Sequence, residues 1–218
     1  TADSAIYISG NAAHDIGTNA TIANANTLQG FASGIHITNA VVASNLDIKY
    51  NKISNNTNAI KNADGAIVDI EKNWWGSNAE PTVNDHTKIN YGQWCTDNTC
   101  ANFNYDIINN TQTKYYGKSQ FARALSEAAA NDTVTFDNHT SAMTQVPVGT
   151  ANITINGSDN TTFDQALTVA AQNITLDDIA FTNTVTITAS GVKITGSTLT
   201  ATVDIQATGA VIGETGAG

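Results

Sequence analysis

An eighteen-residue repeat in the last third of the chain constrains the fold more than any other feature. Five sets of apolar residues recur at this step: Phe163, Phe181, Leu199; Leu167, Val185, Val203; Val169, Ile187, Ile205; Ile174, Val192, Ala210; and Leu176, Ile194, Ile212. Within each repeat the apolar residues form i, i+2 pairs, and such a pair lies on one face of a strand. Three short strands per repeat, stacked in register, predict an all-β parallel solenoid with like side chains above each other in its core.

The first 76 residues carry a looser version of the same pattern. Its repeats are about 22 to 29 residues long, and they relate Ser4–Ala12 to Ser33–Ala40 and weakly to Thr57–Ala63, Ile48 to Ile70, and Asn51 to Asn73. Longer loops between strands account for this spacing without changing the three-strand coil. We therefore predict an N-terminal β-helix over residues 1–76.

Residues 77–117 lack periodicity and are predicted to be a cap and linker. They follow Trp74 and Trp75 and include Trp94. The open end of a solenoid exposes apolar core and unpaired strand edges, which must be covered. The tryptophans are therefore interpreted as a structural cap, and the alternative for such a cluster is a platform on which sugar rings stack.

A single helical segment interrupts the strand pattern at about 119–131. Phe121, Ala124, Leu125 and Ala128 fall on one helical face, and Ser119 is the expected N-cap. The helix is predicted to cover the start of a second β-helix, so that this domain spans residues 118–218. In that domain the turn before the regular repeat is 21 residues long, and the three extra residues fall between residues 155 and 163.

Composition excludes several partners. The formal net charge of −10 repels nucleic acid and anionic lipid. No apolar run approaches the ~20 residues that a membrane-spanning helix needs. We expect no nucleic-acid partner, no membrane span and no cofactor.

The two cysteines, Cys95 and Cys100, lie in the sequence W-C-T-D-N-T-C. Their closeness favours a disulfide that closes a small loop, provided that the backbone lets the thiols meet. The alternative is a pair of free thiols in a reducing compartment. Two cysteines alone do not supply a four-ligand zinc site.

Acceptor motifs for N-glycosylation favour an extracellular location. The chain has nine N-x-S/T motifs, of which seven follow residue 100, beyond what its composition produces by chance. Glycans on such asparagines decorate the surface of secreted proteins. The candidates are Asn19, Asn55, Asn109, Asn131, Asn138, Asn152, Asn156, Asn160 and Asn173.

Two segments carry a resemblance to a known family. The segment N-W-W-G-S-N-A-E-P, which begins at Asn73, resembles the end of a coil in pectin-lyase-like right-handed parallel β-helix proteins of prokaryotic, archaeal-type cell surfaces. The segment from Ala124 to Val134 resembles a helix-to-strand entry of the same proteins. The resemblance covers most of the chain and implies a right-handed coil, but its motifs mark architecture and not activity.

Many enzymes of this fold cleave acidic polysaccharides, and the sequence does not favour that activity. The resemblance implies an arginine base on a coil face, whereas the single arginine, Arg123, lies on the predicted helix. The neighbouring carboxylates Asp177 and Asp178 fit two-carboxylate hydrolysis, but one repeat later Thr195 and Gly196 take their places. A solvated turn is the preferred interpretation, and we do not expect an enzyme.

Two further site hypotheses are weaker. His36 lies between two inward isoleucines and is predicted to point outward as a surface histidine, without further metal ligands. Ice binding requires an unbroken ladder of threonines, but Asp204 interrupts the column of Thr168 and Thr186, and Lys193 interrupts that of Thr175.

The two outer ends of the predicted coils have no capping segment in the sequence. Ile6 and Ile8 belong to the first turn, and Ala210 and Ile212 to the last. We predict that the last turn of one subunit stacks on the first turn of the next, which gives a head-to-tail filament or surface layer. The alternatives are a carbohydrate-binding adhesin or S-layer fragment of a longer tandem β-helix and, less favoured, a polysaccharide-degrading enzyme.

Overall fold

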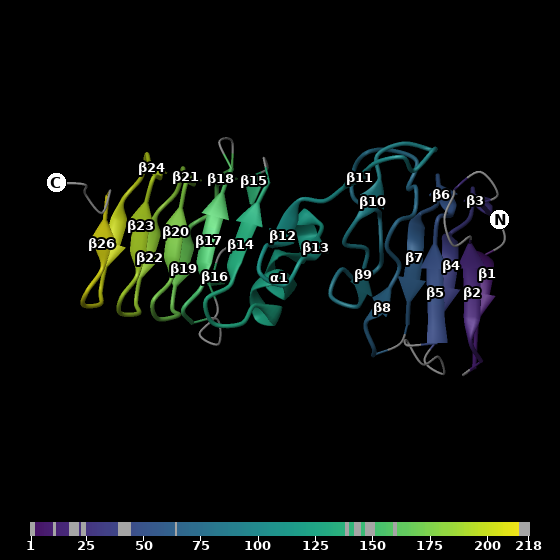
Figure 1. The fold of residues 1–218 in the computed structure, drawn as a ribbon, viewed down its shortest axis with the longest axis horizontal. Helices are drawn as coiled ribbons and strands as arrows, with labels where there is room; N and C mark the ends of the chain where they lie inside the picture. The colour runs from purple at the N-terminus through teal and green to yellow at the C-terminus, as the bar shows by residue number, and fades with distance from the viewer. Residues whose placement is uncertain are drawn as a thin grey trace. The chain divides into compact units, whose positions relative to one another are not determined.

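The fold is given by a computed structural model of the chain. The structure describes residues 3–10, 12–17, 22, 25–38, 45–63, 65–137, 140–141, 145–146, 151–158 and 161–213. The chain divides into two units, Thr1–Tyr105 and Asp106–Gly218. Each unit consists of short strands stacked side by side along a coil (Figure 1), and one short α-helix lies among the described residues of the second.

The second unit is a three-sided parallel β-solenoid, as the eighteen-residue repeat predicts. One side has the strand order β13(Lys114–Tyr116)-β12(Ile107–Asn109)-β14(Thr133–Phe136)-β17(Thr154–Gly157)-β20(Thr175–Asp177)-β23(Lys193–Thr195)-β26(Val211–Ile212). The other two sides are β15(Thr140–Ser141)-β18(Thr162–Phe163)-β21(Ala180–Phe181)-β24(Thr198–Leu199) and β16(Gln145–Val146)-β19(Leu167–Val169)-β22(Val185–Ile187)-β25(Val203–Ile205). From β14 onward every neighbouring pair is parallel.

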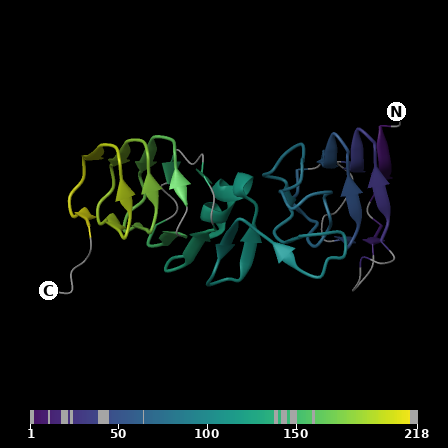
Figure 2. The same cartoon turned by 90° about the horizontal axis from the view of Figure 1, so that it is seen from above.

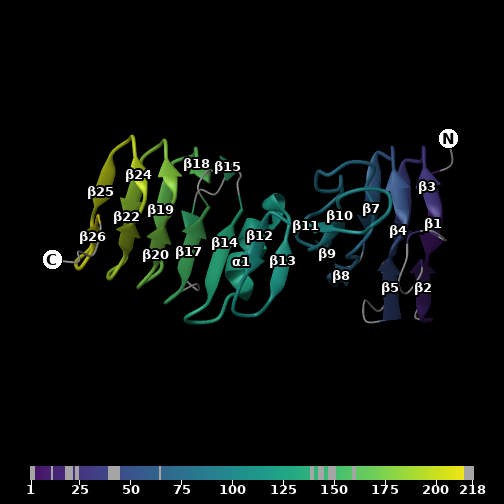
Figure 3. The same ribbon diagram turned by 45° about the horizontal axis from the view of Figure 1, so that its top comes forward.

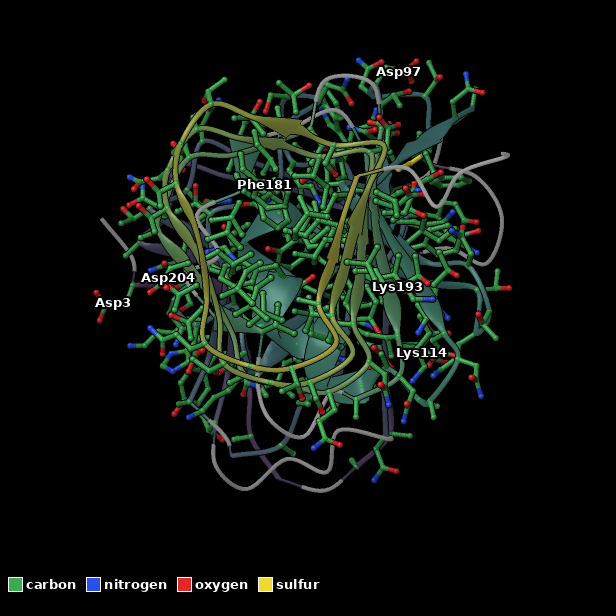
Figure 4. All side chains as sticks on the ribbon, turned by 90° about the vertical axis from the view of Figure 1, so that its left-hand side faces the viewer. Asp3, Asp97, Lys114, Phe181, Lys193 and Asp204 are labelled. Carbon is green, nitrogen blue, oxygen red and sulfur yellow. A yellow bond between two sulfur atoms is a disulfide. The ribbon has the colours of Figure 1, made fainter. Side chains whose placement is uncertain are left out.

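The predicted interior columns of the second unit are confirmed. Phe163 pairs with Phe181, and Phe181 with Leu199, in successive turns. The rings of Phe163 and Phe181 meet edge to face, with centroids 5.6 Å apart. Viewed along the coil, Phe181 lies inside it and Asp204 points outward (Figure 4). Each turn therefore buries its apolar side chains against equivalents above and below.

The longer turn that precedes the eighteen-residue repeat also follows the prediction. Ile155 and Phe163 lie eight positions apart in the sequence. Their partners in the next turn, Leu176 and Phe181, lie five positions apart. The three extra residues lie between β17 and β18, and the described part of that connection is closed by Thr161, whose N–H donates to the carbonyl of Ser158 over 2.7 Å.

The cap of the second unit differs from the prediction in two respects. The helix α1 spans Phe121–Glu127, preceded by a 3₁₀ turn at Lys118–Gln120, so it is shorter than the expected 119–131. It ends because Ala128 has an extended backbone, and Ser119 lies within the 3₁₀ turn instead of capping α1. As predicted, Ala124 and Leu125 are buried, with Phe121 and Ala128 packed against the same core.

The edge of the first parallel strand is covered by a hairpin that the sequence did not reveal. Strand β12 pairs antiparallel with both β13 and β14 (Figure 3). This pairing satisfies the backbone of β14 on the side that no earlier solenoid turn covers. The cap of the second unit is therefore a hairpin and a helix together.

The first unit is a less regular parallel coil. Its strands form the sheets β1(Ser4–Ile8)-β4(Ser33–Ile37)-β7(Asn58–Asn62), β2(His14–Gly17)-β5(Leu46–Lys49), β3(Thr27–Gln29)-β6(Lys52–Ser54), β8(Val68–Asp69)-β9(Ile89–Asn90) and β10(Trp94–Cys95)-β11(Phe103–Asn104). All of these pairs are parallel except the last. The stacked turns can be followed from above in Figure 2.

Parallel pairing in this unit continues past residue 76, where we predicted that the first β-helix ends. Val68 pairs with Ile89, and Ile60 forms a parallel bridge with Val83. The predicted cap and linker, 77–117, is divided: residues up to Tyr105 belong to the first unit, and Asp106 and those after it to the second. Long, irregular connections hide this last turn from a search for periodicity.

Buried asparagines hold one corner of the first unit. The Nδ2 of Asn26 donates to Oδ1 of Asn51 over 3.0 Å, and the Nδ2 of Asn51 donates to Oδ1 of Asn73 over 3.0 Å. Asn51 and Asn73 are fully buried. Because they also bond to backbone groups of neighbouring turns, these side chains replace the backbone bonds that the corner lacks.

Candidate functional site

The tryptophans at the end of the first unit are mostly enclosed. Trp94 is fully buried, its Nε1 donates to the carbonyl of Asn78 over 3.2 Å, and its ring lies 6.2 Å from that of Tyr91. Trp75 is buried in the same core, and Trp74 is half-buried. The faces of Trp75 and Trp94 are therefore not available for stacking on a sugar, which favours their interpretation as a cap.

A polar cluster stabilises the same end. The hydroxyl of the buried Tyr91 donates to Oε2 of Glu80 over 3.0 Å and lies 2.7 Å from Nδ1 of His86. Since the phenol proton is directed at Glu80, His86 supplies the proton of the second bond. The arrangement anchors a buried phenol to two polar side chains, and we assign it to stability.

The predicted disulfide is present. Cys95 and Cys100 are joined, with their Cα atoms 4.7 Å apart. Cys95 is fully buried, and its N–H donates to the carbonyl of Asn73 over 3.0 Å. The disulfide therefore closes the short loop from Cys95 to Cys100, and Cys95 lies in the coil turn that stacks on Asn73.

Three of the glycosylation motifs have an origin in the coil itself. Asn131, Asn152 and Asn173 occupy one corner in successive turns with φ of 71°, 58° and 54°, and Gly191 and Gly209 follow with φ of 72° and 73°. Asparagine and glycine tolerate this left-handed conformation best. Two residues after each asparagine the next strand has an outward threonine, and these threonines pair in register. The repeating geometry thus produces N-x-T without reference to glycans.

The remaining motifs differ in accessibility. Asn55 is exposed, as are the three corner asparagines, and Asn156 is half-buried with its Nδ2 donating to Oδ2 of Asp177 over 3.2 Å. Asn109 is fully buried and donates from Nδ2 to Asp132 over 2.8 Å, which corrects its inclusion among the candidates, because a buried, bonded amide is closed to modification in the folded chain. Asn19, Asn138 and Asn160 lie outside the described residues.

The residues considered for catalysis are engaged in structural contacts. Arg123 lies on α1 and forms an ion pair with Glu127, with Nε 2.6 Å from Oε1. Burial disfavours ionisation of Glu127, but the hydrogen bond and charge of Arg123 outweigh it and hold the pKa of that carboxyl below its usual value. Burial, and then the charge of Glu127, raises the pKa of Tyr116, whose hydroxyl donates to Glu127 over 3.0 Å. This group fastens α1 to β13.

The aspartate pair also belongs to a turn. Asp177 accepts from the hydroxyl of Thr195 over 2.7 Å, and the two residues pair in register as predicted. Asp178 is exposed at a corner with φ of 55°. Among the described residues, no group of three His, Cys, Asp or Glu side chains is placed to hold a metal ion.

A polar groove lies on the outer face of the sheet β1-β4-β7. It has a volume of about 610 Å³. Tyr7, His36 and Lys61 pair in register along its floor, and the rings of Tyr7 and His36 meet edge to face, 5.1 Å apart. Its other lining residues are Asp3, Ser4, Ala32, Ser33, Thr57, Asn58 and Asn84.

This groove was not identified from the sequence, although the signal was there. His36 was placed on the surface between Ile35 and Ile37, and both isoleucines are fully buried as expected. The three internal repeats of the first unit, once aligned, put Tyr7 and Lys61 at the same outward position as His36. Treating the repeats as columns of outward residues reveals the site.

The last described turn of the second unit has an incompletely covered core. Ile205 is 48% exposed and Ile212 is 39% exposed, whereas their equivalents one turn earlier, Ile187 and Ile194, are 0% and 1% exposed. The strands β24, β25 and β26 each pair on one side among the described residues. Of the predicted contact residues at the other end, Ile8 is buried and Ile6 is half-buried.

Comparisons with known proteins found no match from which a function could be transferred. No protein-family model, no curated protein and no solved structure matches the chain. Across the described residues, the structure has no helix that is both long and apolar enough to cross a bilayer.

Proposed function

We propose that this protein is an extracellular structural subunit whose β-solenoid stacks end to end into a filament or surface layer. The observation that carries the proposal is the exposure of Ile205 and Ile212, whose equivalents in the preceding turn are buried. Apolar side chains exposed beside strands that pair on one side among the described residues form a surface that another set of strands can cover.

Strand addition is the mode of assembly that fits the first strands of the first unit and the last described strands of the second. At one end β24, β25 and β26 each have a neighbour on one side among the described residues, and at the other β1, β2 and β3 do so as well. Parallel pairing of one set with the other in a second copy continues the coil. The two surfaces differ, so the contact is head-to-tail, and it gives an open filament where the rotation between successive copies does not close a ring.

An extracellular location is supported by the disulfide and by the exposed glycosylation motif at Asn55, which lies outside the repeated corner of the second unit. Disulfides persist mainly in oxidising compartments, and Cys95 and Cys100 account for all the cysteines of the chain. The coil, the N-W-W-G segment that begins at Asn73 and these features together favour a surface protein of the pectin-lyase-like, archaeal type. We assign no catalysis to it, since Arg123 is committed to Glu127.

The test compares the assembly of three proteins by negative-stain imaging and analytical ultracentrifugation. The unmodified chain is expected to form elongated, concentration-dependent species. Ile212→Lys places a charge in the exposed core and is expected to abolish them. Val211→Lys, at the outward neighbour on the same strand, repeats the lysine found one turn earlier at Lys193 and is expected to leave assembly intact.

Two outcomes contradict the filament. A monomer at every concentration rejects it. A reading frame that continues past Gly218 with further turns of similar period shows that the same edge is covered within one polypeptide, which favours a tandem adhesin or S-layer protein.

A second candidate function, glycan binding, is favoured by the groove on β1-β4-β7. Tyr7 is 63% exposed beside hydroxyl and amide side chains. An exposed aromatic face packs on the C–H groups of a sugar while such polar groups bond its hydroxyls. Calorimetric titration with β-1,4-linked glucose and glucuronate oligosaccharides tests it. We expect millimolar binding of at least one oligosaccharide that Tyr7→Ala abolishes, and no heat with either removes this function. An enzyme would in addition release shortened products.

A further inference from the structure

We propose that the groove on β1-β4-β7 selects acidic glycans by proton-coupled binding, in which a ligand carboxylate is held between His36 and Lys61. The inference rests on the glycan-binding role proposed for the same groove and adds the charge of its ligand and the regulation of its affinity.

The geometry supplies two nitrogen-bearing side chains at adjacent positions. His36 on β4 and Lys61 on β7 pair in register, and neighbouring strands in a sheet are about 4.8 Å apart. Both side chains are half-buried and line the groove. A carboxylate that lies over this pair accepts from both, while Tyr7 on the far side of His36 offers an aromatic face to the sugar ring.

The charges around His36 make its protonation depend on the ligand. Lys61 is the cation that faces it from β7, Asp3 is the anion that faces it from the segment before β1, and the uncharged side chains of Tyr7 and Asn84 complete its surroundings. Burial, and then the charge of Lys61, lowers the pKa of His36, with Asp3 acting in the opposite direction. The empty groove therefore favours the neutral form of His36.

A bound carboxylate changes the charges that act on His36. A carboxylate over the pair screens the charge of Lys61 and adds its own negative charge, so it raises the pKa of His36. The ligand then binds together with a proton, and its affinity increases as the pH falls through the range in which histidine titrates. A uronate stays ionised there, because its own pKa lies near those of aspartate and glutamate, at about 4.

The experiment uses two oligosaccharides that differ in the carboxylate alone. A β-1,4-linked glucuronate tetramer and the corresponding glucose tetramer are titrated into the full chain by calorimetry at about pH 7.5 and about pH 5, in buffers of different ionisation enthalpy. For the glucuronate tetramer we expect affinity about three- to fivefold higher at the lower pH, the range of one exposed ion pair, together with net proton uptake. The glucose tetramer is expected to show neither.

Two variants assign the effect. His36→Gln keeps a polar outward side chain and is expected to remove the pH dependence and the proton uptake. Lys61→Gln is expected to weaken glucuronate binding at both pH values. Glucuronate binding that is independent of pH in the unmodified chain, or an equal gain for the glucose tetramer, overturns the proton-coupled mechanism while glycan binding stands. Absence of binding by both tetramers removes the glycan-binding role itself.

Discussion

The two units make the same kind of coil with different corners. In the first unit, side chains hold a corner: Asn51 and Asn73 are buried and bond to each other and to neighbouring backbone. In the second unit, a column of left-handed residues from Asn131 to Gly209 forms a corner without a buried amide, and the exposed side chain of Asn173 donates to Oδ1 of Asn152 over 2.8 Å. Left-handed residues also precede Asn51 and Asn73 in the first unit, at Tyr50 and Lys72, so the difference lies in the buried amides that satisfy backbone groups there.

If regular stacking is the main source of stability in the second unit, removing one member of a column has the largest effect. Phe181→Ala deletes a buried ring between Phe163 and Leu199. We expect the free energy of unfolding to fall by about 3–5 kcal/mol, as for other buried phenylalanines. Urea denaturation followed by hydrogen exchange of peptides from each unit measures the loss and locates it.

Leu199→Ala is the matched control for position in the stack. Leu199 is half-buried in the last described turn, so truncation to alanine there is expected to reduce stability by about 1 kcal/mol in the monomer, because a smaller and less buried side chain loses less apolar area. Equal losses at Phe181 and Leu199 would contradict the difference in burial. A loss at Leu199 that grows under assembling conditions would support the stacking of subunits.

The corresponding test in the first unit removes an amide. Asn73→Ala takes away the acceptor of Asn51 and the donor to the carbonyls of Ile48 and Ile70, all within the buried corner. Unsatisfied buried groups cost about 1–3 kcal/mol each, and with partial relaxation we expect a total loss of about 3 kcal/mol.

Hydrogen exchange should place that loss in the first unit alone. Asn98→Ala, at an exposed turn position of the same unit, is the control and should change stability by less than about 0.5 kcal/mol. A loss in Asn73→Ala no larger than in Asn98→Ala would show that backbone pairing, not the ladder, holds this corner.

The difference in regularity between the two units explains which parts of the fold could be predicted from the sequence. Identical turns leave a periodic apolar signal, and for that reason Phe163, Phe181 and Leu199 were assigned to one column that the structure contains. The last turn of the first unit carries no such signal, since Val83 and Ile89 are separated from their partners by connections of unequal length. It was therefore interpreted as a linker.

Two other features were not found by following the apolar periodicity. The hairpin of β12 and β13 is antiparallel and occurs once, so no repeat marks it. The groove requires the outward residues of three turns to be considered together: Tyr7, His36 and Lys61 are unremarkable one at a time. In contrast, the disulfide was predicted because its two cysteines are close in the sequence itself.

Loss of the disulfide should lower the stability of the first unit alone, by less than Phe181→Ala or Asn73→Ala lowers the stability of its own unit. Cross-linking so short a loop contributes about 2 kcal/mol in the chain-entropy model, and both cysteines lie in the first unit. We expect Cys95→Ser with Cys100→Ser to destabilise the first unit by about that amount and to leave exchange rates in the second unchanged. Reduced and alkylated protein is the second measurement. Equal destabilisation of both units would show that they do not unfold independently.

The smallest expected effect is a pH dependence confined to the cap of the second unit. Asp132 is buried, and its Oδ2 accepts from Nδ2 of Asn109 and from the N–H of Ala129, each over 2.8 Å. Burial opposes ionisation of Asp132, but these hydrogen bonds outweigh it and lower the pKa of the carboxyl. A lowered pKa means that its stabilisation is complete above the unfolded pKa of about 3.9 and is lost as the pH falls further, through the folded value.

Hydrogen exchange of the β12–β13 hairpin between about pH 5 and about pH 2.5, corrected for intrinsic rates, should therefore show protection decreasing below about pH 4. Asp132→Asn keeps the shape of the side chain without its titration, so its hairpin should be less protected at pH 5 and lose less on acidification. If that variant loses protection as steeply as the unmodified chain, another carboxylate governs the pH dependence of the cap. The next residue to substitute is then Glu127 on α1, which is bonded to Tyr116 and Arg123.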